Sequence, residues 1–132
     1  MQIDWNREGE EAIERLRRMI RFDTTNPPGA ELALAQDLAA EVAAEGMEGQ
    51  VLVSGEGRGN LALRLRGDGS MRPLLLLSHL DVVSVEPEQW SHAPFAGERD
   101  RGFVWGRGAI DSKLTGAVHM QLLLMAKRMG LK

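Results

Sequence analysis

The stretch Pro73-Leu74-Leu75-Leu76-Leu77-Ser78-His79-Leu80-Asp81 decides the fold that we expect for this chain. A run of four leucines between turn signals is typical of a strand that is buried on both faces of a sheet. The run ends in a histidine and an aspartate, and α/β sheets bind ligands at the carboxyl ends of their strands. The stretch therefore predicts a central strand at 74–77 and a candidate site at His79 and Asp81.

Helical periodicity flanks this predicted strand on both sides. Apolar residues recur at three- and four-residue steps over about 6–22, 30–45 and 112–129, which predicts three helices. The last of these carries a broad apolar stripe, suited to packing against a sheet: Leu114, Val118, Leu122, Met125 and Met129, widened by Leu123 and Leu124.

Shorter patterns predict the remaining strands. They are a strand at 51–53, an alternating strand at 61–65 and a hairpin over 95–105 with residues 99–102 at its tip. The order of helix, helix, strands and helix favours an α/β architecture, a sheet with helices on its faces.

Composition narrows the class of protein. The chain has 132 residues, a length that fits one domain, and 43% of them are hydrophobic. Its formal net charge of −3 argues against nucleic acid or an anionic membrane as the main partner. Cysteine is absent, which excludes disulfides and thiolate chemistry. The sequence shows neither an apolar run of membrane-spanning length nor a signal peptide, so we expect a soluble, cytoplasmic protein.

The candidate site residues each have two interpretations at this point. Residues two apart on an extended segment point to the same side, so Asp81 could hold one imidazole nitrogen of His79 and leave the other for a metal. The alternative is a histidine at a strand end beside a turn-forming aspartate. Asp111 follows a glycine-rich bend and precedes a helix, where capping is the usual role of an aspartate. Lys113 would then be a solvated cation of the first helical turn.

Considered together as one sequence pattern, these residues indicate a function more specifically than each does alone. His79-Leu80-Asp81-Val82-Val83 is followed by Trp90, Pro94-Phe95 and the run Gly102-Phe103-Val104-Trp105-Gly106-Arg107-Gly108-Ala109-Ile110-Asp111-Ser112-Lys113. This string resembles the zinc-dependent M20 metallopeptidase family, which includes acetylornithine deacetylase, succinyl-diaminopimelate desuccinylase, aminoacylase-1 and carboxypeptidase S. The segment Asp23–Gly29 also looks like the N-terminal part of that family. Ser84 and Leu114 depart from the family pattern, in which proline and glycine are common at these places.

The resemblance implies roles for individual residues. His79 would bind one of two zinc ions, Asp81 would orient His79, and Asp111 would bridge both metals. It also implies a cis peptide bond between Asp111 and Ser112. The activity would be hydrolysis of the amide bond of a small N-acyl amino acid or peptide, with two metals activating a water.

The resemblance also implies what lies outside these 132 residues. The family's Glu-Glu pair, which supplies the general base, its remaining metal ligands and a lid domain that carries dimer contacts follow the Asp111 motif, and no glutamate occurs after Glu98. We therefore expect residues 1–132 to be the N-terminal portion of a mixed-sheet catalytic domain with helices on both faces, without the lid domain and the C-terminal half.

Three expectations follow for the chain as it stands. It should be inactive, with weak or absent zinc binding, because His79 and Asp111 alone cannot complete a tetrahedral zinc shell. The parent enzyme should be a homodimer, while these residues could self-associate through an exposed sheet edge or the last helix. The alternative is a non-catalytic binding or regulatory module that retains part of the metallopeptidase fold.

Overall fold

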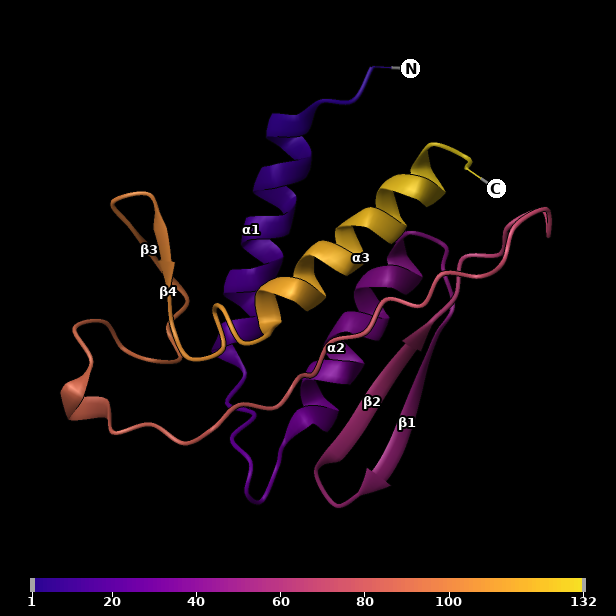
Figure 1. The fold of residues 1–132 in the computed structure, drawn as a ribbon. Helices are drawn as coiled ribbons and strands as arrows, with labels where there is room; N and C mark the ends of the chain where they lie inside the picture. The colour runs from indigo at the N-terminus through magenta and orange to yellow at the C-terminus, as the bar shows by residue number, and fades with distance from the viewer. Residues whose placement is uncertain (1, 132) are drawn as a thin grey trace.

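Residues 2–131 are described by a computed structural model, which contains three helices and two small sheets (Figure 1). The helices are α1 (Trp5–Arg21), α2 (Glu31–Ala44) and α3 (Lys113–Arg128). Each lies within one residue of its predicted bounds at both ends, since amphipathic periodicity is a local signal. The mixed α/β class that the sequence predicts is confirmed.

Both sheets are antiparallel and two-stranded. Strand β1 (Gly49–Gly55) pairs with β2 (Arg58–Leu63), and β3 (Glu98–Asp100) pairs with β4 (Phe103–Trp105). The second pair confirms the predicted hairpin, and its two-residue turn at Arg101 and Gly102 has positive φ at both positions, as a tight hairpin turn requires. A 3-10 turn, η1 (Pro87–Gln89), precedes this hairpin.

The core lies where the three helices meet. Helix α1 packs on α3, and the β1–β2 hairpin packs on α2 (Figure 1). Fully buried apolar side chains join the helices, among them Met19 and Ile20 of α1, Leu34 and Leu38 of α2, and Leu124 of α3. Within residues 2–131, no helix is both long and apolar enough to span a membrane.

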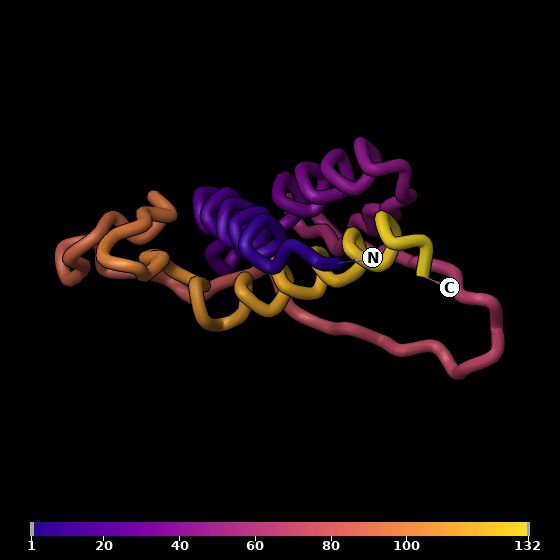
Figure 2. Tube along the Cα trace, turned by 90° about the horizontal axis from the view of Figure 1, so that it is seen from above, coloured from indigo at the N-terminus to yellow at the C-terminus, as the bar shows by residue number. Residues whose placement is uncertain are grey.

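The predicted strand at 74–77 is wrong for this structure. Residues 64–80 run as an irregular segment outside the helices (Figure 2), and none of 73–78 belongs to a strand. The side chains of Leu74, Leu75 and Leu77 are 84%, 81% and 78% exposed. Their composition suits a buried strand, but burial needs a neighbour on each side, and none of the described elements pairs with this segment.

The predicted packing face of the last helix is also wrong in part. Leu114, Val118 and Leu122 are partly exposed, at 40–48%. The buried face of α3 is instead the one that carries Lys113, Gly116, Ala117, Met120 and Leu124, together with Gln121 and Met125. Helix α3 therefore packs on α1 and leaves part of the predicted stripe open.

Candidate metal centre

His79 and Asp111, which lie 32 residues apart in sequence, are in contact. Nε2 of His79 lies 2.9 Å from Oδ1 of Asp111. On the other side of the imidazole ring, Nδ1 lies 3.0 Å from the backbone oxygen and 3.2 Å from Oδ1 of Asp81. The three candidate site residues are thus brought together, with the ring of His79 held between two carboxylates.

The capping role considered for Asp111 is wrong. Helix α3 begins at Lys113 and its N-cap residue is Ser112, whose side chain makes no capping hydrogen bond. The Asp111 side chain is 87% exposed and contacts His79. The peptide bond between Asp111 and Ser112 is cis, as the family resemblance implies.

Two contacts fasten the Asp111 loop to the segment that carries His79. Ser112 Oγ accepts a hydrogen bond from the backbone N–H of His79 and donates one to its carbonyl, both at 3.3 Å. Gly108, at φ +83°, packs against Val82, and a Cβ at this position would lie 2.7 Å from a Val82 methyl carbon. Only glycine combines this backbone conformation with so close an approach.

The N-terminal segment supports Asp81 from a third direction. Asn26 Nδ2 donates a hydrogen bond of 2.9 Å to Asp81 Oδ2. Backbone bonds from Asn26 N to Val82 O and from Val82 N to Thr24 O form a short parallel bridge beside it. Sequence reasoning missed Asn26 as a site residue, and its only signal was its place in the segment Asp23–Gly29.

Lys113 is fully buried, so its interpretation as a solvated cation is wrong. Its Nζ donates hydrogen bonds of 3.0 and 2.8 Å to the carbonyls of Met19 and Phe22 at the C-terminal end of α1. Burial lowers the pKa of Lys113 to about 8. A cation at a helix C-terminus satisfies carbonyls that have no partner within the helix. Lys113 therefore links the end of α1 to the start of α3.

Electrostatics at the site follow from these contacts. The hydrogen bond to Asp111 raises the pKa of His79 above its ordinary value, against the effect of burial. The hydrogen bond from Asn26 lowers the pKa of Asp81, and His79 adds to the effect. The carboxylate of Asp81 is therefore kept ionised where it faces the imidazole.

The side chains fit a zinc ion in kind but not in number. Imidazole nitrogen and carboxylate oxygen are both zinc ligands, and a carboxylate on the second nitrogen commonly orients such a histidine. A structural or catalytic zinc needs three or four protein ligands. Within residues 2–131, no group of three or more histidine, aspartate or glutamate side chains is arranged to hold one metal ion.

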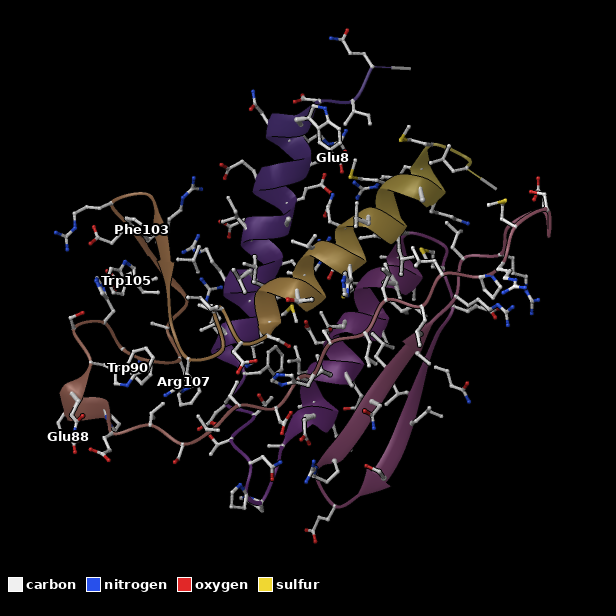
Figure 3. The ribbon with its side chains drawn as sticks, viewed as in Figure 1. Glu8, Glu88, Trp90, Phe103, Trp105 and Arg107 are labelled. Atoms are coloured by element: carbon white, nitrogen blue, oxygen red, sulfur yellow. The ribbon has the colours of Figure 1, made fainter. Side chains whose placement is uncertain are left out.

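A separate aromatic group lies on the β3–β4 hairpin and the loops that flank it. The guanidinium of Arg107 lies 5.1 Å from the ring centre of Trp90, and both residues are labelled in Figure 3. The rings of His92 and Trp105 stack at 4.2 Å, and Nδ1 of His92 lies 3.0 Å from Glu98. His92 therefore packs and pairs with residues of the hairpin.

Comparison with known proteins shows which families the chain is similar to. Residues 75–132 match the model of peptidase family M20/M25/M40. The chain is 31% identical to aminoacylase-1 of Sus scrofa over 94% of its own length and 31% of that protein's. It is 38% identical to succinyl-diaminopimelate desuccinylase of Paracoccus denitrificans (strain Pd 1222), over 73% of this chain and 24% of the relative. These matches support the expectation that the chain is a fragment of the M20/M25/M40 peptidase family, with residues 75–132 matching the family's own pattern.

A further relative matches over a shorter part of the chain. The chain is 46% identical to the N-fatty-acyl-amino acid synthase/hydrolase PM20D1 of Xenopus tropicalis over 46 residues, which are 35% of this chain and 9% of that protein. The alignments to these three relatives span at most 31% of the relatives' own lengths.

Proposed function

We propose that residues 1–132 supply part of the metal site of a di-zinc amide hydrolase, namely His79, Asp81 and Asp111. The observation that carries the proposal is the contact of His79 Nε2 with Asp111 Oδ1, at 2.9 Å, in a chain that matches the M20 family pattern. The relatives are named as an aminoacylase, a desuccinylase and an N-fatty-acyl-amino acid synthase/hydrolase. These names support a small N-acyl amino acid or peptide as the substrate class.

In this proposal, each residue has a separate task. His79 and Asp111 would be metal ligands, with Asp111 bridging the two ions. Asp81 positions the imidazole through Nδ1, and Asn26 in turn fixes Asp81. Bound zinc would polarise the scissile carbonyl and activate a water. Ser112 holds the Asp111 loop against the segment of His79, and Lys113 links the start of α3 to the end of α1.

The 132 residues on their own do not turn over substrate in this proposal. Two donors leave at least one ligand position of each zinc to be filled by other side chains. The general base of the family has no counterpart after Glu98. Residues 1–132 would thus be a partial catalytic domain whose remaining ligands come from elsewhere. We further propose a cytoplasmic location and a homodimeric parent enzyme.

The test compares two polypeptides, the 132-residue chain and the product of the complete reading frame. Each is assayed for zinc-dependent release of free amino acid from a panel of N-acetyl, N-succinyl and long-chain N-acyl amino acids. We expect activity in the complete product only, abolished by His79→Ala or Asp111→Ala and retained in His119→Ala. If His119→Ala abolished the chelator-sensitive activity while His79→Ala and Asp111→Ala retained it, the proposed metal site would be wrong. Robust turnover by the 132-residue chain would contradict its inactivity.

A further inference from the structure

Four residues of the sequence string that resembles the family have no task in the proposed metal chemistry. They are Trp90, Pro94, Gly106 and Arg107. They lie on the two loops next in sequence to the candidate site, since residues 83–94 follow Asp81 and residues 106–110 precede Asp111. In the structure the two loops meet at these four residues, and the two side chains at the meeting point are labelled in Figure 3.

The contact between the two loops is made by the backbone and the side chain of Arg107. Its backbone N–H donates a hydrogen bond of 2.7 Å to the carbonyl of Pro94. Its guanidinium carbon lies 5.1 Å from the ring centre of Trp90, which is a cation–π contact. Nη2 donates a long hydrogen bond of 3.5 Å to the carbonyl of Ser84. Arg107 therefore fastens its own bend to three points of the earlier loop.

The chain between Arg107 and Asp111 has little freedom to absorb a shift of the guanidinium. Only residues 108–110 separate the two, and the N–H of Ala109 donates a hydrogen bond of 3.2 Å to the carbonyl of Gly106. A Cβ at Gly106 would lie 3.0 Å from the carbonyl oxygen of Pro94, so the loops are in close contact there. A displacement of Arg107 would therefore be passed to the backbone of Asp111.

Stability alone does not explain an arginine at this place. Nε of Arg107 is buried and has no hydrogen-bond partner within residues 2–131. A buried donor without an acceptor lowers stability, and such donors are rare in folded proteins. A lysine would have no such donor, but it would also lack the planar group that lies on the indole while a second nitrogen bonds a carbonyl. The unpaired Nε therefore favours a role in geometry.

We infer that Arg107 is a positioning residue of the metal site, which fixes Asp111 relative to His79 by clamping the loop after Asp81 to the bend before Asp111. The inference rests on the proposed function, because it assigns Asp111 and His79 as ligands. Arg107 acts through the backbone that leads to Asp111. Groups that orient metal ligands from outside the ligand shell change metal affinity or activity about 10–100-fold when they are replaced.

The first experiment replaces Arg107 in the product of the complete reading frame. Arg107→Lys keeps the charge and removes the planar group. We expect at least about a tenfold loss of zinc affinity, measured by competition with a chromogenic chelator, and a lower kcat with KM nearly unchanged. The control is Arg101→Lys, on a side chain that is 80% exposed at the tip of the β3–β4 hairpin, which should change none of these values.

Urea denaturation of the metal-free protein separates positioning from stability. Arg107→Lys should shift the urea midpoint little, because the loss of the cation–π contact is offset by removal of the unpaired Nε. A lower midpoint with unchanged zinc affinity would show a structural role only and would overturn the inference. Equal zinc affinities of Arg107→Lys and Arg101→Lys would overturn it as well.

Substitutions of Trp90 test the other half of the contact. Trp90→Phe retains an aromatic face and should keep the zinc affinity within about threefold of wild type. Trp90→Leu removes the face and should reproduce the loss seen in Arg107→Lys. Wild-type zinc affinity in Trp90→Leu, or an equal loss in the two Trp90 variants, would show that the cation–π contact does not position the site.

Hydrogen exchange of the metal-free protein gives a readout that does not depend on zinc. The amides of residues 107 and 109, which bond the carbonyls of Pro94 and Gly106, should exchange faster in Arg107→Lys, while those of α1 should not. Unchanged exchange at both amides would overturn the clamp.

The same zinc titration also tests the proposed function. If His79→Ala leaves zinc affinity unchanged, the proposed function fails and the inference fails with it. If His79→Ala lowers the affinity and Arg107→Lys does not, the proposed function stands and the positioning role of Arg107 is overturned.

Discussion

The side-chain amide of Asn26 donates a hydrogen bond of 2.9 Å to Asp81 across 55 residues of sequence. This bond links the turn after α1 to the residue that faces Nδ1 of His79. The orientation of the imidazole therefore depends on a segment that contributes no candidate metal ligand.

Replacing Asn26 by alanine should destabilise the chain modestly. The variant loses a hydrogen bond to a charged, partly buried carboxylate, for which we expect a loss of about 1 kcal/mol in the free energy of unfolding. Urea denaturation monitored by tryptophan fluorescence measures this loss. The control is Asn60→Ala, at an exposed position of β2. Its free energy of unfolding should stay within about 0.5 kcal/mol of the wild-type value. Equal stability of the Asn26 variant and wild type would mean that water replaces the amide.

Zinc binding by the 132-residue chain should be weak and should depend on His79. Two donors do not complete a zinc shell, so we expect gel filtration to remove added zinc from the chain. In an equilibrium titration, His79→Ala should lower the remaining affinity at least about tenfold. His119→Ala should not change it. Stoichiometric retention of zinc, or an equal effect of the two substitutions, would contradict the assignment of His79.

The sequence predicts the helices well and the site in part. Helical periodicity depends on residues three and four apart, so the bounds of all three helices are confirmed within one residue. His79, Asp81 and Asp111 could be named because they occur in a motif string. Asn26 and the buried Lys113 could not be assigned contacts, since their partners lie 55 and more than 90 residues away.

The run Leu74–Leu77 shows where sequence patterns stop being informative. Four leucines have the composition of a buried strand, but their burial depends on neighbours that the pattern does not identify. The described residues provide no paired strand on either side, and the leucines are exposed. The alternative interpretation of Asp111 as a helix cap fails for a related reason. Capping is a local preference, and the contact with His79 replaces it.

Acid should remove the stabilisation provided by Arg128. Its guanidinium bonds Glu45 of the α2 C-cap and Glu11 of α1, and lies 3.5 Å from Glu8. The bond from Arg128 lowers the pKa of Glu45 below 4.5, and the pKa of Glu11 is lowered by Arg128 and Gln121 despite burial. Carboxylates with a lowered folded pKa stabilise the fold above about pH 4.5 and cease to do so as pH falls through that folded pKa.

The corresponding measurement compares wild type with Arg128→Gln by urea denaturation between pH 7 and pH 3. The variant should be less stable by about 1 kcal/mol at pH 7, since the groups are partly exposed and screened. The difference should shrink towards zero at pH 3. Arg66→Gln, at an exposed position, serves as the control and should show no such trend. A difference that stays constant with pH would assign the role of Arg128 to packing instead.

Removing the ammonium of Lys113 should destabilise the junction of α1 and α3. In Lys113→Met, the aliphatic volume is nearly preserved, while the carbonyls of Met19 and Phe22 lose their buried donor. The Met19 carbonyl keeps the bond from Phe22 N–H at 3.3 Å, so the Phe22 carbonyl is the one left without its donor. An unsatisfied buried carbonyl costs about 1–3 kcal/mol, and relief of the buried charge offsets part of this. We therefore expect a net loss of about 1–2 kcal/mol in the free energy of unfolding. Lys127→Met, at an exposed position near the end of α3, should change stability by less than about 0.5 kcal/mol.

Hydrogen exchange gives a second readout, because the amides of the last turn of α1 should lose protection in Lys113→Met alone. If Lys113→Met is as stable as wild type, desolvation of the ammonium equals the value of its two hydrogen bonds, and Lys113 does not stabilise the junction.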